Sequence, residues 1–237
     1  MENPFYHLIL VYLSFMTLGI VIQFFLINKG KDKKESWKKF IFFNLIIFSL
    51  ILCYHFIPYF LKIAFVLISL GGLLELFSIT RDNPAQFRLT SILFYVAIFS
   101  LFVFGAFSVS KSILIQTFAL VAVFDGYSQL GGKWIGKRKL AFKISPNKTW
   151  EGFVIGLITC YSFGLALFLL DSLSIYYFLF AIPILAVSGD LIASSIKRKS
   201  KVKDFSNLIP YQGGIMDRFD SYVFTVSVLS LISYLFL

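Results

Sequence analysis

The side chains best suited to chemistry lie in one short stretch near the carboxyl terminus, between two apolar segments. Residues 194–220 contain six cations and three carboxylates, namely Lys197, Arg198, Lys199, Lys201, Lys203, Arg218, Asp204, Asp217 and Asp220. Gly213 and Gly214 lie among them, and a glycine pair lets backbone amides approach an anion closely. This combination predicts a site that binds phosphate.

Three carboxylates are expected to meet beside this stretch. Asp190 lies within an apolar segment, and the basic run begins seven residues later, which corresponds to roughly 10 Å along a helix. Asp217 and Asp220 are three residues apart and would share one face of a helix. If the two helix ends pack together, the cluster suits Mg²⁺ bound with water and substrate phosphates. The alternative is that Asp217 forms an interfacial ion pair with Arg218 or Lys203.

The cations have two competing explanations. Arg198 and Arg218 are expected to bind phosphate, because a guanidinium group offers a fork of donors to phosphate oxygens. A run of charge beside an apolar segment is also typical of residues that only orient a membrane protein. For Lys199 and Lys201 this second explanation is sufficient.

A second polar loop, residues 125–152, contains glycines, lysines and hydroxyl groups ahead of an apolar segment. Ser145 followed by Pro146 predicts a helix N-cap with proline at the first helical position, and a helix amino terminus presents free amides to an anion. The spacing of a nucleotide-binding P-loop is absent. The candidate substrate-binding residues of this loop are Asp125, Lys137, Ser145, Lys148, Thr149 and Glu151.

Glu75 is a carboxylate inside an apolar segment, in the run Gly71-Gly72-Leu73-Leu74-Glu75. A carboxylate within a membrane span is costly to desolvate and is therefore a candidate functional residue. It also lies close enough to the end of the span to reach the headgroup region or to pair with Arg81. Both interpretations are kept.

The elements that position these residues are membrane helices. The chain has 237 residues, of which 58% are hydrophobic and 14% are charged, whereas soluble domains are about one quarter charged. Apolar runs long enough to cross a bilayer recur along the chain. They predict an all-α polytopic membrane protein with about eight transmembrane helices, near residues 5–28, 40–58, 60–80, 89–109, 112–130, 151–170, 174–196 and 219–237.

The basic residues are concentrated in every second predicted loop. Of 22 Lys and Arg residues, 20 lie in residues 29–39, 81–88, 131–150 and 197–218, all on one side of an eight-helix arrangement. This asymmetry predicts that the long polar loops face the cytoplasm. It also accounts for the net charge of +10 without a nucleic-acid partner. The two cysteines, Cys53 and Cys160, lie in apolar segments and show neither metal-type spacing nor a disulfide framework.

The two polar loops together resemble the phosphatidate cytidylyltransferase (CDP-diglyceride synthase) family. The family signature is matched in register from Ser194 to Asp220, a stretch of 27 residues. Gln212 is the single departure, at a position where the family usually has His. Residues 145–152 (Ser-Pro-Asn-Lys-Thr-Trp-Glu-Gly) resemble a second family motif, although Ser128-Gln129 stands where the family has Ala-Tyr. The resemblance covers roughly residues 120–237.

This resemblance implies that the chain transfers a cytidylyl group from CTP to phosphatidic acid, producing CDP-diacylglycerol and pyrophosphate. It further implies that Asp190, Asp217 and Asp220 hold Mg²⁺ and act in catalysis with Lys197 and Arg198. Substrate would be bound by Lys203, Asp204, Gln212, Gly213, Gly214 and Arg218 together with the 125–152 loop.

The expected organisation is an N-terminal transmembrane bundle, residues 1–110, followed by a catalytic transmembrane region, residues 111–237. The expected location is a bacterial inner membrane, with membrane lipids as surroundings and a homodimer left open. Two alternatives remain: a related CTP-using enzyme acting on another lipid phosphate or a polyprenol, and a transporter with acidic relay residues. The transporter is disfavoured because the acidic residues cluster toward one rim of the membrane.

Overall fold

The structure, a computed structural model, describes residues 4–27, 33–57, 59–170, 172–174, 178–210 and 212–236. Residues 28–32, part of the first predicted basic loop, lie outside this description. The chain forms two compact units, the first from Met1–Phe56 with Ile115–Ile184 and the second from Ile57–Leu114 with Leu185–Leu237. These units are defined by packing; the expected functional division after residue 110 stays a prediction.

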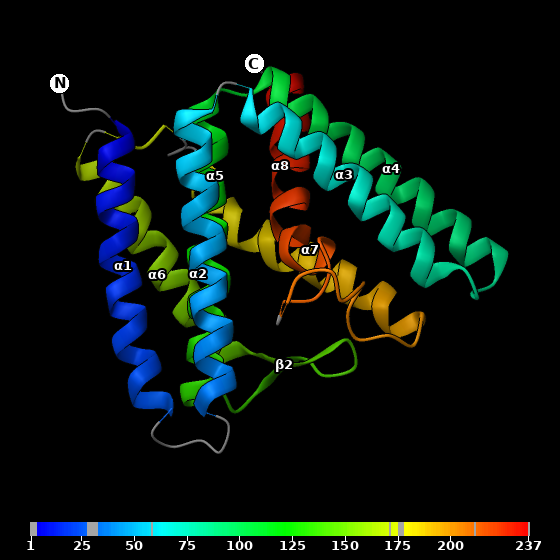
Figure 1. Cartoon of the computed structure of the whole chain (residues 1–237), viewed down its shortest axis with the longest axis horizontal. Helices are drawn as coiled ribbons and strands as arrows, with labels where there is room; N and C mark the ends of the chain where they lie inside the picture. The colour runs from blue at the N-terminus through cyan, green and yellow to red at the C-terminus, as the bar shows by residue number, and fades with distance from the viewer. Residues whose placement is uncertain are drawn as a thin grey trace. The chain divides into compact units, whose positions relative to one another are not determined.

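Helices dominate both units and follow the predicted segments closely (Figure 1). Their bounds are α1 Pro4–Ile27, α2 Lys33–Phe56, α3 Phe60–Thr80, α4 Ala85–Ser108, α5 Lys111–Ile135, α6 Trp150–Leu169, α7 Ala181–Lys199 and α8 Met216–Phe236. Within the described residues, six of them, α1 to α6, are long and apolar enough to cross a membrane. A helix satisfies its own backbone hydrogen bonds, which lipid requires. The chain is therefore a helical integral membrane protein.

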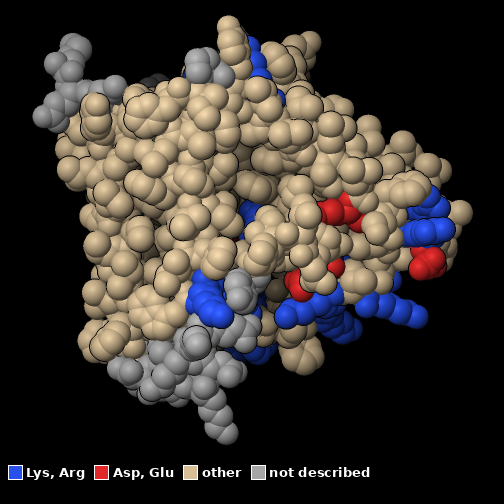
Figure 2. All heavy atoms as spheres, in the orientation of Figure 1, with Lys and Arg blue, Asp and Glu red and all other residues tan. Residues whose placement is uncertain are grey.

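The surface agrees with this conclusion. Many large apolar side chains are exposed, among them Leu10, Phe25, Leu74 and Phe107. Figure 2 shows broad areas of the drawn face without Lys, Arg, Asp or Glu, and charged side chains gathered in a few places. Exposed apolar surface of this extent is expected where a protein faces lipid.

The first unit contains α1, α2, α6 and residues 115–135 of α5. Its interior includes Phe124 of α5 and Cys160 and Phe163 of α6, all fully buried. Close packing of α5 on α6 depends on Gly156, because a Cβ atom there would lie 2.9 Å from the carbonyl oxygen of Phe124. The absence of that side chain brings the polar stretch after Asp125 beside the start of α6.

A short β-hairpin follows α5 and was not predicted. Strand β1 (Lys139–Ala141) pairs antiparallel with β2 (Ser145–Thr149). The prediction of a helix N-cap at Ser145 is therefore wrong, because residues 145–149 are extended and paired with β1. Helix α6 begins at Trp150, and Thr149 caps it by accepting a hydrogen bond of 3.1 Å from the Gly152 amide.

The second unit packs α3, α4 and α8 with residues 185–199 of α7. The rings of Phe65 on α3 and Phe102 on α4 stack at 3.9 Å between centroids, and Tyr222 of α8 meets both edge-on. Gly72 on α3 admits the start of α8, because a Cβ atom there would lie 2.8 Å from the sulfur of Met216. This packing holds the beginning of α8, which carries the candidate chemistry, against α3.

Candidate active site

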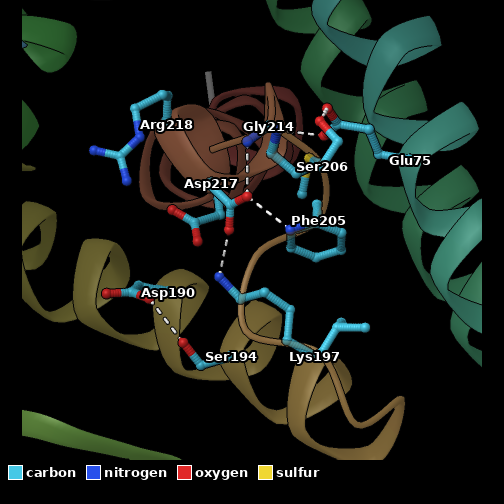
Figure 3. Close-up of polar contacts among 12 residues, drawn as sticks. Glu75, Asp190, Ser194, Lys197, Phe205, Ser206, Gly214, Asp217 and Arg218 are labelled. Carbon is cyan, nitrogen blue, oxygen red and sulfur yellow. Dashed lines mark hydrogen bonds and ion pairs between the residues drawn. The ribbon is translucent and has the colours of Figure 1, made fainter. Parts of the chain in front are cut away.

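The centre of the second unit's polar region is a buried ion pair between the last turn of α7 and the first turn of α8. The ammonium nitrogen of Lys197 lies 2.7 Å from Oδ1 of Asp217, and the two side chains are 9% and 2% exposed. Lys197 also lies over the ring of Phe205, 5.1 Å from its centroid. Asp217 is thus ion-paired, as the alternative interpretation expected, but with Lys197 and not with Arg218 or Lys203 (Figure 3).

Asp217 also organises the loop between the two helices. Its Oδ2 accepts hydrogen bonds from the backbone amides of Phe205 at 2.7 Å and Gly214 at 2.8 Å. Gly213 adopts a left-handed φ of 87°, and a Cβ atom on it would lie 2.8 Å from Asp217 Oδ2. The glycine pair does let amides approach an anion closely, and in this structure that anion is the chain's own carboxylate.

Asp190 and Asp220 lie at the crossing of α7 and α8. Gly189 allows this crossing, since a Cβ atom there would lie 2.9 Å from the carbonyl oxygen of Asp220. Asp190 accepts a hydrogen bond of 3.1 Å from Ser194, and Asp220 accepts one of 2.7 Å from the amide of Ser221. Sequence reasoning did not consider Tyr95 of α4, which is buried in the same unit.

The three aspartates do not form one cluster in this structure. Among the described residues, no group of three or more His, Cys, Asp or Glu side chains is arranged to hold a metal ion. Asp190 and Asp220 share one crossing, whereas Asp217 is engaged by Lys197 and by two amides. The metal assignment therefore stays a prediction.

Arg218 and Gln212 form a second polar contact beside the start of α8. The side-chain oxygen of Gln212 accepts a hydrogen bond of 2.8 Å from the Arg218 guanidinium, and Gln212 is only 6% exposed. The Nε of Arg218 is buried and has no hydrogen-bond partner within the described part of the chain. Gln212 therefore orients the Arg218 guanidinium group, and the Nε–H of Arg218 can still donate a hydrogen bond.

The remaining charged residues of this segment lie at the surface. Arg198, Lys203 and Asp204 are exposed. Arg198 donates a hydrogen bond of 3.2 Å to the carbonyl oxygen of Val202, in the turn that follows α7. These side chains can meet a ligand from outside, whereas Lys197 and Asp217 cannot do so without rearrangement.

Glu75 is buried and faces α8. Its carboxylate accepts hydrogen bonds from the Ser206 hydroxyl at 2.6 Å and from the amides of Ile215 and Met216, each at 2.9 Å. The structural interpretation expected headgroup contact or pairing with Arg81, and the observed partners are instead Ser206, Ile215 and Met216. The functional interpretation stays a prediction. The sequence signal for this contact was Gly71-Gly72, one turn earlier on α3, because glycines on a helix allow a neighbouring segment to pack closely.

The second predicted loop belongs to the first unit and has its own organisation. Glu151 accepts hydrogen bonds from the amides of Lys137 at 2.9 Å and Arg138 at 3.1 Å, and so closes the base of the hairpin. Thr149 is buried as the cap of α6. Ser145 and Lys148 lie on β2, and Asp125 lies on α5. The expected convergence of this loop with residues 194–220 stays a prediction.

Comparison with known proteins places the chain in a family. Proteins named phosphatidate cytidylyltransferase are similar to this chain: those of Rickettsia bellii and Rickettsia felis are 31% and 32% identical over 73% of the chain, covering 79% and 81% of the relatives. That of Staphylococcus saprophyticus is 34% identical over 70% of the chain and 67% of the relative. The cytidylyltransferase family model matches residues 3–236. The chain belongs to the cytidylyltransferase family and is an enzyme of membrane lipid chemistry.

Proposed function

We propose that this chain is a phosphatidate cytidylyltransferase, which joins CTP and phosphatidic acid to give CDP-diacylglycerol and pyrophosphate. Support comes from its relatives, which carry that name and are 31–34% identical over about 70% of the chain or more. The observation that carries the proposal is the segment from Ser194 to Asp220, where cations and carboxylates surround the start of α8.

The reaction is a transfer between two phosphate groups. An oxygen of the lipid phosphate forms a bond to the α-phosphorus of CTP. The bond from that phosphorus to the bridging oxygen breaks, and its electron pair leaves with pyrophosphate. Such a transfer requires positioning and neutralisation of charge more than covalent help from the protein.

Each charged residue then has a proposed role. Arg198, Lys203 and Arg218 would bind phosphate oxygens, with Lys197 neutralising charge once a substrate phosphate competes with Asp217 for its ammonium group. Gln212 would keep Arg218 in position. The 125–152 loop would contribute Lys137 and Lys148 toward the nucleotide or headgroup.

The carboxylates fit Mg²⁺ in chemical type, because this ion prefers one or two carboxylates completed by water and substrate phosphates. Asp190 and Asp220 would supply that pair, because Gly189 lets α7 approach the backbone of α8 at Asp220, and Asp217 lies about one turn of α8 away. When bound, the ion would neutralise charge on the transferring phosphates and the leaving pyrophosphate.

The membrane arrangement is part of the proposal. Helices α7 and α8 would span the bilayer together with α1 to α6, and both polar loops would face the cytoplasm of a bacterial inner membrane. Their basic residues support this orientation. A phosphate head at the membrane surface would then meet the residues at the end of α7 and the start of α8.

The test uses the purified full-length protein with CTP, Mg²⁺ and phosphatidic acid in mixed micelles. We expect CDP-diacylglycerol and pyrophosphate in equal amounts, identified by mass spectrometry. Asp217→Asn should abolish both products, because an amide cannot hold the Lys197 ammonium group as an ion pair. Absence of turnover by the wild type with any lipid phosphate would refute the proposal.

A further inference from the structure

The buried carboxylate of Glu75 is compensated by an unusual set of donors. It is 8% exposed within the apolar helix α3, where an uncompensated charge would be costly. Two of its three donors are the amides of Ile215 and Met216. The first amides of a helix have no acceptor within the helix, and its amino terminus favours negative charge. Glu75 therefore caps α8 from a different helix.

The same carboxylate holds the loop that Asp217 holds, at neighbouring residues. On the incoming side of the loop, Phe205 donates to Asp217 and Ser206 donates to Glu75. On the outgoing side, Gly214 donates to Asp217 and Ile215 donates to Glu75. Asp217 and Glu75 thus accept hydrogen bonds from adjacent residues at both ends of the 205–215 loop.

The start of α8 and the residues before it pack closely against α3 around Glu75. A Cβ atom on Gly214 would lie 2.5 Å from Oε1 of Glu75, and one on Gly71 would lie 2.5 Å from the side chain of Ile215. Side chains at either glycine would push α8 away from α3. The chain leaves room for Glu75 to reach the first turn of α8, where Asp217 and Arg218 lie (Figure 3).

We propose that Glu75 is a positioning residue for the reaction: it fixes the first turn of α8 and the 205–215 loop, so that Asp217 and Arg218 are held in register with Lys197. It touches neither substrate. This proposal rests on the proposed cytidylyltransferase activity. It also means that the amides of Gly214, Ile215 and Met216 already donate to protein carboxylates and are not available to a substrate phosphate.

The test compares Glu75→Gln with Ser69→Ala in the full-length enzyme. Ser69 is a matched control, because it is buried on the same helix and, among the described residues, its hydroxyl bonds only within α3, to the carbonyl oxygen of Phe65 at 2.8 Å. Glutamine keeps the size of Glu75 but lacks the charge and one acceptor oxygen. A displacement of about 1 Å can reduce turnover by roughly 100-fold. We therefore expect Glu75→Gln to lower kcat by about 10- to 100-fold, with KM for CTP and for lipid changed by less than about threefold.

A second variant covers the case in which Glu75→Gln does not fold. Ser206→Ala removes one of the three donors and leaves the carboxylate in place, and it should lower kcat by about two- to fivefold at unchanged KM. Hydrogen exchange followed by mass spectrometry gives a readout independent of activity. Peptides containing residues 213–216 should exchange faster in both variants, and peptides from α4 should not.

The outcomes separate the two proposals. If Glu75→Gln and Ser206→Ala both keep the kcat and the hydrogen exchange of the wild type, the positioning role of Glu75 is overturned and the proposed cytidylyltransferase activity is not. A large rise in KM with unchanged kcat would also overturn it, because Glu75 would then contribute to substrate binding. If the wild type makes no CDP-diacylglycerol but peptides containing residues 213–216 exchange faster in the variants, the positioning role of Glu75 is supported and the proposed activity is rejected.

Discussion

At the scale of single residues, Asp217 links the end of α7, the segment that follows it and the start of α8. One of its oxygens pairs with Lys197 and the other accepts two backbone amides. Sequence reasoning identified Asp217 as important from its type and spacing. It did not identify the partner, because Lys197 is 20 residues away in sequence and no local rule links the end of one helix to the start of another.

Replacing Lys197 by Gln tests the ion pair. Removing one partner leaves a charge buried without compensation, and the loss of one charge-stabilising group typically lowers turnover by about 100-fold. We expect a loss of this size in kcat for Lys197→Gln, measured as CDP-diacylglycerol formed from CTP and phosphatidic acid.

Lys199→Gln is the matched control for Lys197. Lys199 is exposed, and its ammonium group lies over the ring of Phe87 at 5.3 Å. An exposed charge of this kind contributes little, so activity should stay within about twofold of the wild type. Equal losses in the two variants would contradict a specific role for the buried pair.

Gln212 gives a second prediction at this scale, since it stands where the family usually has His. Its contact with Arg218 requires only an acceptor atom, which a histidine ring nitrogen also provides. Gln212→His should therefore keep kcat/KM within about threefold. Gln212→Leu should lower it by about 10- to 100-fold, because a hydrogen bond to a charged group contributes about 1.5–3 kcal/mol. Greater damage from His than from Leu would contradict this role.

At the scale of elements, the helices could be predicted and the hairpin could not. Long apolar runs give a strong signal, and the described residues form a helix in each of the eight predicted segments, six of them long and apolar enough to cross a membrane. Strands of three and five residues, one of them beginning Ser-Pro, carry no alternation of apolar and polar residues. Glu151 accepts hydrogen bonds from the amides at 137 and 138 at the base of the hairpin, and these contacts are not visible in a sequence pattern.

The position of the cap gives a test at this scale. Thr149→Val removes the acceptor for the Gly152 amide at nearly constant shape, which should cost about 1 kcal/mol and lower the apparent Tm by about 2–4 °C. Ser145→Ala should change it by less than about 1 °C. Thermal unfolding of both purified variants in detergent checks this. A larger fall in Tm for Ser145→Ala than for Thr149→Val would identify Ser145 as the cap of α6.

At the scale of the whole molecule, charge placement predicts orientation. The loop after α5 is strongly basic, whereas residues 109–110 between α4 and α5 carry no Lys or Arg. In a variant lacking Cys53 and Cys160, a cysteine at exposed Ser110 should react with an impermeant maleimide on intact cells. A cysteine at exposed Asn147 should react only after the membrane is opened. Labelling of Asn147→Cys on intact cells would contradict the cytoplasmic orientation.

The most direct measurement of the central claim follows the label from CTP into lipid. Purified wild-type protein is incubated with phosphatidic acid and CTP labelled at either its α- or its γ-phosphate. The proposed activity predicts that the α-label enters the lipid product and that the γ-label is released with pyrophosphate. Transfer of the γ-label to the lipid would identify a kinase, and it would contradict the assignment of this chain as a phosphatidate cytidylyltransferase.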